Sequence, residues 1–300
     1  MNPDAPSATF GPVTVFFGEK NGKYPDGNQV VVRGADTLAV FDTPQVAQRI
    51  GDAFDAADLA ILGHVHEDHM AGLRRIPRAA VHVHEADVDA ARSWAGLSRH
   101  YGYPESVLGP LRAKIERDFD YAPRPDAIAY ADGARWELGG GVSVSAIHMP
   151  GHTAGHSVLL VEPEGVAFIG DIDLSGFGPY YGDATSDLGA FRRTLRRVAE
   201  IPARTWVTSH HKGVYTERAA FETALRAFEA TLGAREAKLL GMIGDGARTL
   251  DELVAMRLLY PEGYEEVWID CAERRTIGQH LDELLAAGRV RVEDGRWRAA

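Results

Sequence analysis

The sequence contains one cysteine, Cys271, among 300 residues. A single thiol excludes an intrachain disulfide and removes cysteine from any site that needs several metal ligands. It is typical of a protein of the reducing cytoplasm. No apolar run approaches the roughly 20 residues that a bilayer-spanning helix needs. The N-terminus has no basic region ahead of an apolar core, so we expect no secretory signal, no membrane association and a cytoplasmic location.

Basic residues are outnumbered as well. The formal net charge of −11 at pH 7 disfavours nonspecific attraction to nucleic acid or anionic lipid. We therefore expect a small-molecule substrate rather than a nucleic acid. The hydrophobic content of 45% and the charged content of 25% are ordinary for a globular chain, and this length suits a large domain with a small appendage.

Histidine is scarce overall but concentrated in one place. The chain has 12 histidines, and three of them fall within residues 64–69. His64, His66, Asp68 and His69 follow the apolar stretch 59–62. Imidazole and carboxylate ligands suit zinc, iron or manganese, and no thiolate is required. An apolar strand that ends in this loop therefore predicts a metal site.

Three further apolar strands are expected to end in a histidine or an aspartate. The residues at those ends are His152, Asp171 and either His210 or His211. We favour His210 because it follows its strand more directly. Strand ends that converge at one edge would bring these side chains to the first loop. A carboxylate at a strand end can bridge two cations through its two oxygens.

Two strand-rich blocks with helices in each predict an α+β fold of two packed mixed sheets with helices outside. Residues 88–130 look mostly helical, and we interpret them as an insertion over one end of a sheet. After about residue 216 the pattern changes to helices followed by a hairpin. We predict a catalytic domain over 1–233 and a small winged-helix-like module over 234–300.

The motifs resemble those of the metallo-β-lactamase-fold superfamily. Over about residues 10–216 the matching elements occur in the family's order: His64-x-His66-x-Asp68-His69, Gly151-His152, Gly170-Asp171 and Ser209-His210. The resemblance implies an αββα sandwich with metals at one edge. The C-terminal module resembles the winged-helix appendage of some members.

The resemblance also implies a ligand set. His64, His66 and His152 would hold a first metal, Asp68, His69 and His210 a second, and Asp171 would bridge them. The sequence departs from the family pattern at Gly63, where Thr is common, and at Ser209-His210-His211, where Gly-His-Gly is common.

Such a site implies hydrolysis. Two divalent cations, zinc first and iron or manganese as alternatives, would generate a bridging hydroxide at neutral pH. Asp68 and Asp171 are the expected catalytic carboxylates, and Asp68 can also orient the nucleophile and receive a proton. We expect a dinuclear metal-dependent hydrolase of a small acyl substrate such as a thioester, a lactone or a related ester.

Substrate contacts are sought near the last ligands. Tyr180 and Tyr181 lie in the Gly- and Tyr-rich segment 175–183 and are candidates, although their rings could instead simply pack. Lys212 follows the last motif and could meet a substrate anion. Residues 88–125 are candidates for a lid.

Two other functions remain open. Persulfide dioxygenases of the superfamily use one iron held by two His and one Asp, which would make the chain an oxidoreductase. An endoribonuclease relative carries a winged-helix appendage, which would imply a phosphodiesterase. Against the latter, residues 234–300 hold 10 basic and 13 acidic side chains, a composition that repels phosphate.

Several polar and aromatic residues have no assigned chemistry. We expect Glu67 to be solvated, His156 to orient its loop by hydrogen bonding, and His82 and His84 to be structural. A group of apolar residues in the module could either form a homodimer contact or pack on the chain's own catalytic domain. Its members are Tyr260, Tyr264, Val267 and Trp268.

Overall fold

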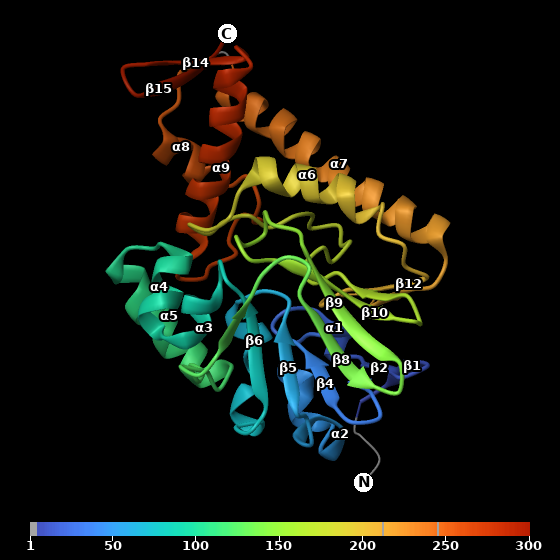
Figure 1. Cartoon of the computed structure of the whole chain (residues 1–300). Coiled ribbons are helices and arrows are strands. Elements are labelled where there is room, and N and C mark those ends of the chain that lie inside the picture. The colour runs from blue at the N-terminus through green and yellow to red at the C-terminus, as the bar shows by residue number, and fades with distance from the viewer. Residues whose placement is uncertain (1–4, 212, 245) are drawn as a thin grey trace.

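The computed structural model describes residues 5–211, 213–244 and 246–300. Two mixed β-sheets form the centre of the molecule (Figure 1). Within the described residues the first sheet has seven strands in chain order: β1 (Ser7–Phe10), β2 (Val13–Phe16), β3 (Gln29–Arg33), β4 (Leu38–Phe41), β5 (Leu59–Leu62), β6 (Ala80–His84) and β7 (Ile128–Tyr130). The second, described over the same parts of the chain, has the order β13-β12-β11-β10-β9-β8, with β8 (Arg135–Gly139), β9 (Val142–His148), β10 (Ser157–Glu162), β11 (Val166–Phe168), β12 (Thr205–Val207) and β13 (Val214–Tyr215).

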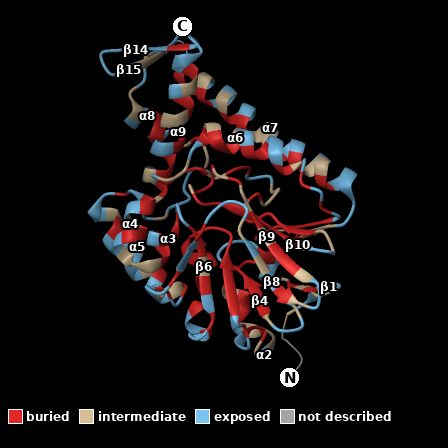
Figure 2. Cartoon of the chain, in the orientation of Figure 1, coloured by how far each residue is buried: buried red, intermediate tan, exposed pale blue. Residues whose placement is uncertain are grey.

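Apolar side chains from both sheets fill the space between them. Phe41 of β4 and Phe168 of β11 meet in this layer with ring centroids 5.9 Å apart. Strands β3, β4 and β5 are buried almost throughout, because one face meets the other sheet and the other face meets helices. This explains their near-continuous apolar sequences. Figure 2 shows the buried layer in red.

Helices cover the outer face of each sheet, so the layer order is αββα (Figure 1). The first sheet is covered by α2 (Asp52–Asp55), α3 (Val88–Arg92), α4 (Trp94–Tyr101) and α5 (Glu105–Asp118). The second is covered by α6 (Leu188–Val198) and α7 (Arg218–Ile243). Trp206 of β12 stacks on Phe221 of α7 with centroids 4.3 Å apart. The α+β sandwich predicted from the sequence is confirmed.

The predicted helical insertion at 88–130 contains α3, α4 and α5, but its end is a strand. β7 pairs in parallel with β6 and forms the edge of the first sheet. Ser93 caps α4 by accepting from the Gly96 N–H at 3.0 Å, and Gly102 ends the helix in the left-handed conformation. Tyr101 and Tyr103 therefore lie at a fixed turn, where both are buried.

The C-terminal part contains α7, α8 (Leu250–Ala255), α9 (Ile269–Ala286) and the hairpin β14 (Val290–Glu293) and β15 (Arg296–Ala299). These elements enclose a small core of their own that includes Leu253 and Leu281. Thr249 and Glu252 form a capping box at the start of α8. α7 runs unbroken through residue 233, so the expected domain boundary lies inside a helix that belongs to both parts. The winged-helix interpretation stays a prediction.

Short turns carry the chain from the strands to one edge of the sandwich. α1 (Glu19–Gly22) lies ahead of β3, and single helical turns occur at Gln45–Arg49, Glu67–His69 and Leu73–Arg75. β4, β5 and β6 run parallel to one another, as do β11 and β12. Their carboxyl ends therefore open at a common edge. No helix in the described part of the chain combines the length and the apolar character that crossing a bilayer would require.

Candidate metal centre

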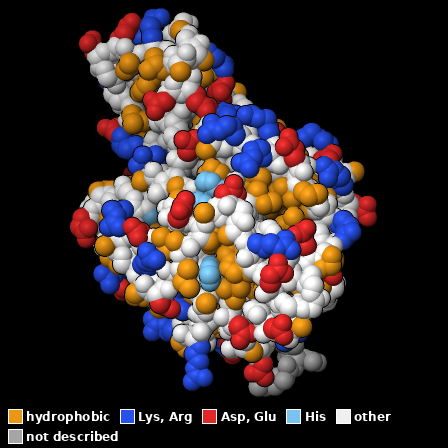
Figure 3. Space-filling model, in the orientation of Figure 1, with side chains coloured by type: hydrophobic (Ala, Val, Ile, Leu, Met, Phe, Trp, Pro, Cys, Tyr) orange, Lys and Arg blue, Asp and Glu red, His pale blue; other side chains and the backbone are white. Residues whose placement is uncertain are grey.

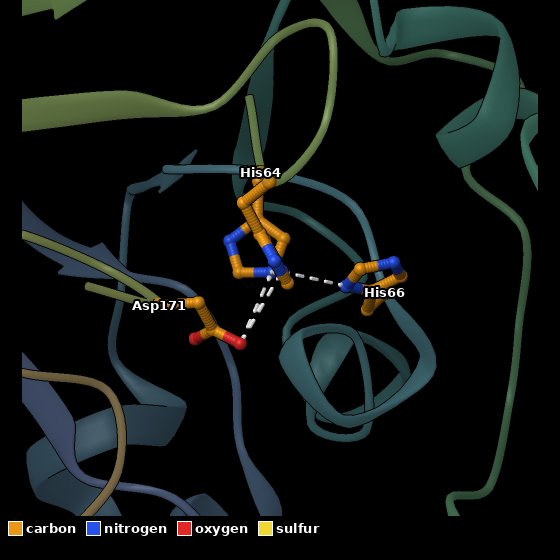
Figure 4. A group of neighbouring side chains, drawn as sticks. His64, His66 and Asp171 are labelled. Carbon is orange, nitrogen blue, oxygen red and sulfur yellow. Dashed lines mark hydrogen bonds and ion pairs between the residues drawn. The ribbon is translucent and has the colours of Figure 1, made fainter. Parts of the chain in front are cut away.

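Seven side chains predicted from the sequence come together at this edge. Three of them form group A, which consists of His64, His66 and His152. Nε2 of His152 lies 3.2 Å from Nε2 of His64 and 3.1 Å from Nδ1 of His66. Figure 4 shows His64, His66 and Asp171 pointing toward one another. The histidines come from two loops far apart in sequence, and all three are buried.

Group B consists of Asp68, His69 and His210, whose ligand atoms lie within 4.8 Å of one another. Oδ2 of Asp68 is 3.1 Å from Nε2 of His210 and 3.5 Å from Nε2 of His69. The single turn at Glu67–His69 separates Asp68 and His69, which belong to group B, from His66, which belongs to group A.

Asp171 lies between the two groups and turns one oxygen toward each. Its Oδ2 is 3.3 Å from Nε2 of His152 in group A. Its Oδ1 is 3.3 Å from Nε2 of His69 and 3.6 Å from Nε2 of His210 in group B. A carboxylate in this position has the geometry needed to join two cations.

The donor set fits divalent cations. Among the described residues, Nε2 of His69 and Oδ1 of Asp171 are buried without a hydrogen-bond partner, although both face the cluster. Buried polar atoms without partners are costly, and a bound cation would satisfy both. Nitrogen and carboxylate oxygen are ligands that zinc accepts. The cluster therefore matches a site for divalent metal ions.

The other ring nitrogen of most of these histidines is engaged elsewhere. Nε2 of His66 lies 2.8 Å from Oδ2 of Asp183, and Nδ1 of His69 lies 2.7 Å from Oδ2 of Asp42. Nδ1 of His152 donates to the Tyr180 carbonyl at 2.9 Å. Such contacts fix the ring orientation and leave the opposite nitrogen to bind metal.

His210 is held in the same way. Its Nδ1 lies 2.9 Å from the carbonyl oxygens of both Gly22 and Asp26. His211, the alternative ligand, has a positive φ of 59° and turns away, with Nε2 3.4 Å from Oδ2 of Asp173. The geometry thus brings His210, and not His211, into the cluster.

Neighbouring charges in the cluster shift the pKa values of its members in the direction opposite to the effect of burial. Burial by itself raises the pKa of Asp171, but His69, His210 and His64 together lower it well below its usual range. Burial similarly opposes protonation of His66, whereas Asp183 and Glu67 raise its pKa to about 9. In Asp171 and His66 the neighbouring charges thus outweigh the effect of burial.

Sequence reasoning missed Asp42 and Asp183. Asp42 directly follows β4, so an acidic residue at a strand end was the available signal, and its Oδ1 also accepts from the Gly63 N–H at 2.7 Å. Asp183 lies in a loop without a regular pattern and carries no such signal. Both side chains are buried.

The expectation that Glu67 is solvated is wrong. Its carboxylate is buried and accepts hydrogen bonds from the hydroxyls of Tyr24 at 3.0 Å and Tyr101 at 2.5 Å. Burial, followed by the neighbouring Asp68 charge, raises its pKa. The Glu67 carboxylate is thus directed toward Tyr24, which lies ahead of β3, and Tyr101 of α4 rather than toward water.

The remaining histidines have structural contacts. His156 fills the role expected of it, with Nδ1 3.0 Å from the Met149 carbonyl and Nε2 accepting from the Asp171 N–H at 3.2 Å. His82 accepts from the indole of Trp136 at 3.3 Å. The His156 contacts join the loop that follows β9 to the loop that carries Asp171, whereas the His82 contact joins β6 to β8.

The two candidate substrate tyrosines have different surroundings. The ring of Tyr180 lies beside His152 and His66, with centroids 5.9 and 6.3 Å apart. Tyr181 is fully buried on the opposite side, where its hydroxyl lies 2.8 Å from Nε2 of His280 and accepts from Arg235 at 3.1 Å. Tyr181 thus occupies the position of a packing residue and not of a substrate contact. Lys212 lies outside the described residues.

The apolar residues of the C-terminal part favour packing on the chain itself. Tyr260 and Trp268 are partners, with centroids 5.4 Å apart, and Trp268 meets Tyr180 at 6.5 Å. Tyr264 and Val267 remain 43% and 45% exposed. A homodimer contact through these exposed residues stays a prediction.

A further group of possible ligands lies away from the cluster, at Glu236, His280 and Glu283. Arg192 lies 3.1 Å from Glu283 and 3.9 Å from Glu236, and Arg289 also pairs with Glu236. Because two guanidinium groups already balance these carboxylates, a cation would meet repulsion there.

The sequence profile described as the metallo-beta-lactamase superfamily matches residues 25–210. The chain belongs to this superfamily. The matched region contains both groups and Asp171, and it ends at His210.

Curated relatives are similar over part of the chain. An atrochrysone carboxyl ACP thioesterase of Pseudocercospora fijiensis is 27% identical over 174 residues, which is 58% of this chain and 49% of the relative. An acyl-coenzyme A thioesterase of Homo sapiens is 28% identical over 172 residues, 51% of this chain and 61% of the relative. The chain thus spans about half to three fifths of the length of these two relatives.

Solved structures of the superfamily share the fold over a larger part of the chain. A metallo-beta-lactamase family protein from Thermus thermophilus has a TM-score of 0.67 and 24% identity, covering 91% of this chain and 94% of its own. A beta-lactamase domain protein from Burkholderia ambifaria has a TM-score of 0.69 and 16% identity, covering 100% and 96%. At these identities the likeness shows the fold alone.

Proposed function

We propose that this chain is a dinuclear metal-dependent hydrolase that cleaves a small acyl substrate, with a thioester as the first choice and a lactone or related ester as the next. The observation that carries the proposal is the position of Asp171, whose two oxygens face group A and group B. Two separate ligand groups joined by one carboxylate are suited to two cations rather than one.

The choice of an acyl substrate is supported by relatives. The fungal and human relatives are named as thioesterases, and a Methylococcus capsulatus relative that is 29% identical over 145 residues is named hydroxyacylglutathione hydrolase. Each of these names describes cleavage of a thioester or of a closely related acyl bond. For this chain the substrate remains part of the proposal.

Different side chains would bind the metal ions and handle the proton of the attacking water. Two divalent cations, with zinc as the expected metal, would supply a water of lowered pKa and would polarise the substrate carbonyl. His64, His66 and His152 would hold one ion, and group B the other. Asp68, buried beside His210, would orient the attacking water and accept its proton.

Nucleic acid is not the expected partner. Figure 3 shows basic and acidic side chains interspersed on the face in view. In the C-terminal part, Arg291 and Arg298 both pair with Glu293, and Arg274 pairs with Asp251. A basic edge neutralised by its own carboxylates offers little to a phosphate backbone.

Metal analysis together with a substrate panel tests the proposal. The purified protein should carry two divalent ions per chain and hydrolyse an acyl-coenzyme A or a lactone faster than a lactam or a phosphodiester. One iron per chain with oxygen uptake on a persulfide, and no hydrolysis, would support an oxidoreductase and contradict the proposal.

A further inference from the structure

The two ligand groups are supported by different parts of the chain. In group B, His69 is held by Asp42, which directly follows β4. His210 is held by the carbonyls of Gly22, at the end of α1, and of Asp26. In group A, His66 and His152 are both held by one short loop that follows Asp171. We call residues 177–183 the support segment.

The support segment contacts two group A histidines within four positions. The carbonyl oxygen of Tyr180 lies 2.9 Å from Nδ1 of His152, and Oδ2 of Asp183 lies 2.8 Å from Nε2 of His66. Oδ1 of Asp183 also accepts from the Tyr103 hydroxyl at 2.5 Å. A displacement of this segment would therefore move the hydrogen-bond partners of both His152 Nδ1 and His66 Nε2 at once.

Arg235 of α7 binds the support segment through several hydrogen bonds. Its guanidinium donates to the carbonyls of Phe177, at 2.6 Å, and of Pro179, and to the hydroxyl of Tyr181. The side chain is buried, with 7% of the residue exposed. Among the described residues, all its hydrogen bonds go to this segment. Five donors in a rigid fork suit a residue that must hold several carbonyls at once.

Gln279 of α9 provides a second attachment. Its Nε2 donates to the Tyr181 carbonyl at 2.9 Å, and its Oε1 accepts from the Leu188 N–H at 2.6 Å. It thus ties the support segment to the start of α6.

Two glycines allow this close docking. A Cβ on Gly178, where φ is +83°, would lie 2.1 Å from Oγ1 of Thr231 on α7. A Cβ on Gly182 would lie 2.8 Å from the Cβ of Ala272 on α9. At both positions the backbone lies too near a C-terminal helix for a side chain.

We propose that Arg235 and Gln279 are positioning residues for group A, through which α7 and α9 set the affinity of that half of the site for its metal ion. The inference rests on the proposed function in that it requires two bound ions. The C-terminal helices thereby become part of the metal centre's support, although neither helix contributes a ligand. The chain of contacts runs from Arg235 and Gln279 to the support segment, and from there to His66 and His152.

Stepwise metal removal from the full-length holoprotein tests this. Zinc would be withdrawn with a competing chelator, and the cobalt-substituted protein would be followed by its visible absorption. His66→Ala and His210→Ala identify which step belongs to group A and which to group B. The test variants are Gln279→Glu, which keeps the acceptor for Leu188 and loses the donor to Tyr181, and Arg235→Lys, which keeps the charge and loses the fork.

In both test variants the group A dissociation constant should rise by about tenfold, the lower end of the range for groups that contact a ligand directly, because Arg235 and Gln279 act one contact further out. The group B constant should stay within about threefold, and the group A cobalt band should shift. Arg289→Gln is the matched control, since this arginine lies in the same region, is half exposed and pairs with Glu236. It should leave both constants unchanged.

The possible failures are distinguishable. If the unmodified protein binds two ions and both test variants keep the group A constant, the inference is overturned while the proposed function stands. Equal weakening of both steps would also overturn it, because that result indicates general loosening. An unmodified protein that binds a single ion would overturn the proposed function and this inference together. Gln279 lies at a partly exposed position, so its variant should fold even if Arg235→Lys does not.

Discussion

Oδ2 of Asp42 lies 2.7 Å from Nδ1 of His69, and Oδ1 of the same carboxylate accepts from the Gly63 N–H at 2.7 Å. One buried carboxylate thus connects the end of β4, the loop that carries the His-rich run, and a group B ligand. The contact fixes the His69 ring so that Nε2 faces the cluster, where it has no hydrogen-bond partner among the described residues.

Asp42→Asn should weaken metal binding at group B by about 10–100-fold. Asn tolerates the positive φ of 49° at this position, and its oxygen can still accept from Gly63, but its amide would face the His69 N–H as a second donor. Chelator competition measures the change. A group B constant equal to that of the unmodified protein would contradict the assigned role of Asp42.

His66→Ala should remove metal and activity together. The substitution deletes a group A ligand at a buried position, and loss of one ion from a two-metal site should lower hydrolysis by about a hundredfold or more. Elemental analysis and a thioester assay on the same sample provide the check. Full activity at full metal content would refute the ligand assignment.

Tyr101→Phe should destabilise the fold by about 1–3 kcal/mol, because it leaves an oxygen of the buried Glu67 carboxylate without its donor. Tyr121→Phe is the matched control, since the Tyr121 hydroxyl is buried and has no partner among the described residues. Its removal should cost nothing. Urea unfolding of both variants at neutral pH measures the difference, and equal costs would contradict the role assigned to Tyr101.

His280 should make stability fall on acidification. Burial, followed by Arg192 and Arg235, lowers its pKa to about 3, whereas an unfolded chain has a histidine pKa near 6.5. Between these values the unfolded state binds a proton that the native state does not, so stability is greatest above about pH 6.5 and is lost as pH falls toward 3.

The predicted size of this effect is about 2 kcal/mol between pH 8 and pH 5. His280→Gln should remove that part of the pH dependence while keeping a polar group beside the Tyr181 hydroxyl. Urea unfolding of both proteins at the two pH values, at matched metal content, is the measurement. Parallel pH profiles for the two proteins would show that the pKa of His280 is the same in the folded and unfolded states, and would contradict the prediction.

The αββα layers and the cluster were predictable because each candidate ligand follows an apolar strand. His64 follows β5 and Asp171 follows β11, so strand order alone brought their loops to one edge. The short spacing of His66, Asp68 and His69 required them to share a loop. These are local patterns, and a sequence displays them directly.

Long-range contacts were not predictable in this way. Asp183 and His66 are more than a hundred positions apart, and no sequence pattern near either residue indicates that they are in contact. Glu67 was expected in water because the tyrosines that bury it come from two distant segments. Tyr180 and Tyr181 lie in the same Gly- and Tyr-rich segment, but Tyr180 lies beside the metal cluster whereas Tyr181 contacts Arg235 of α7 and His280 of α9. Which tyrosine lies on which side depends on how these two helices pack.

Titration of the metal-free protein with zinc, while thioester hydrolysis is followed, tests the central claim most directly. A site built from two ligand groups around Asp171 predicts that hydrolysis reaches its plateau only at two equivalents of zinc per chain. A plateau at one equivalent, or full hydrolysis before any metal is added, would contradict it.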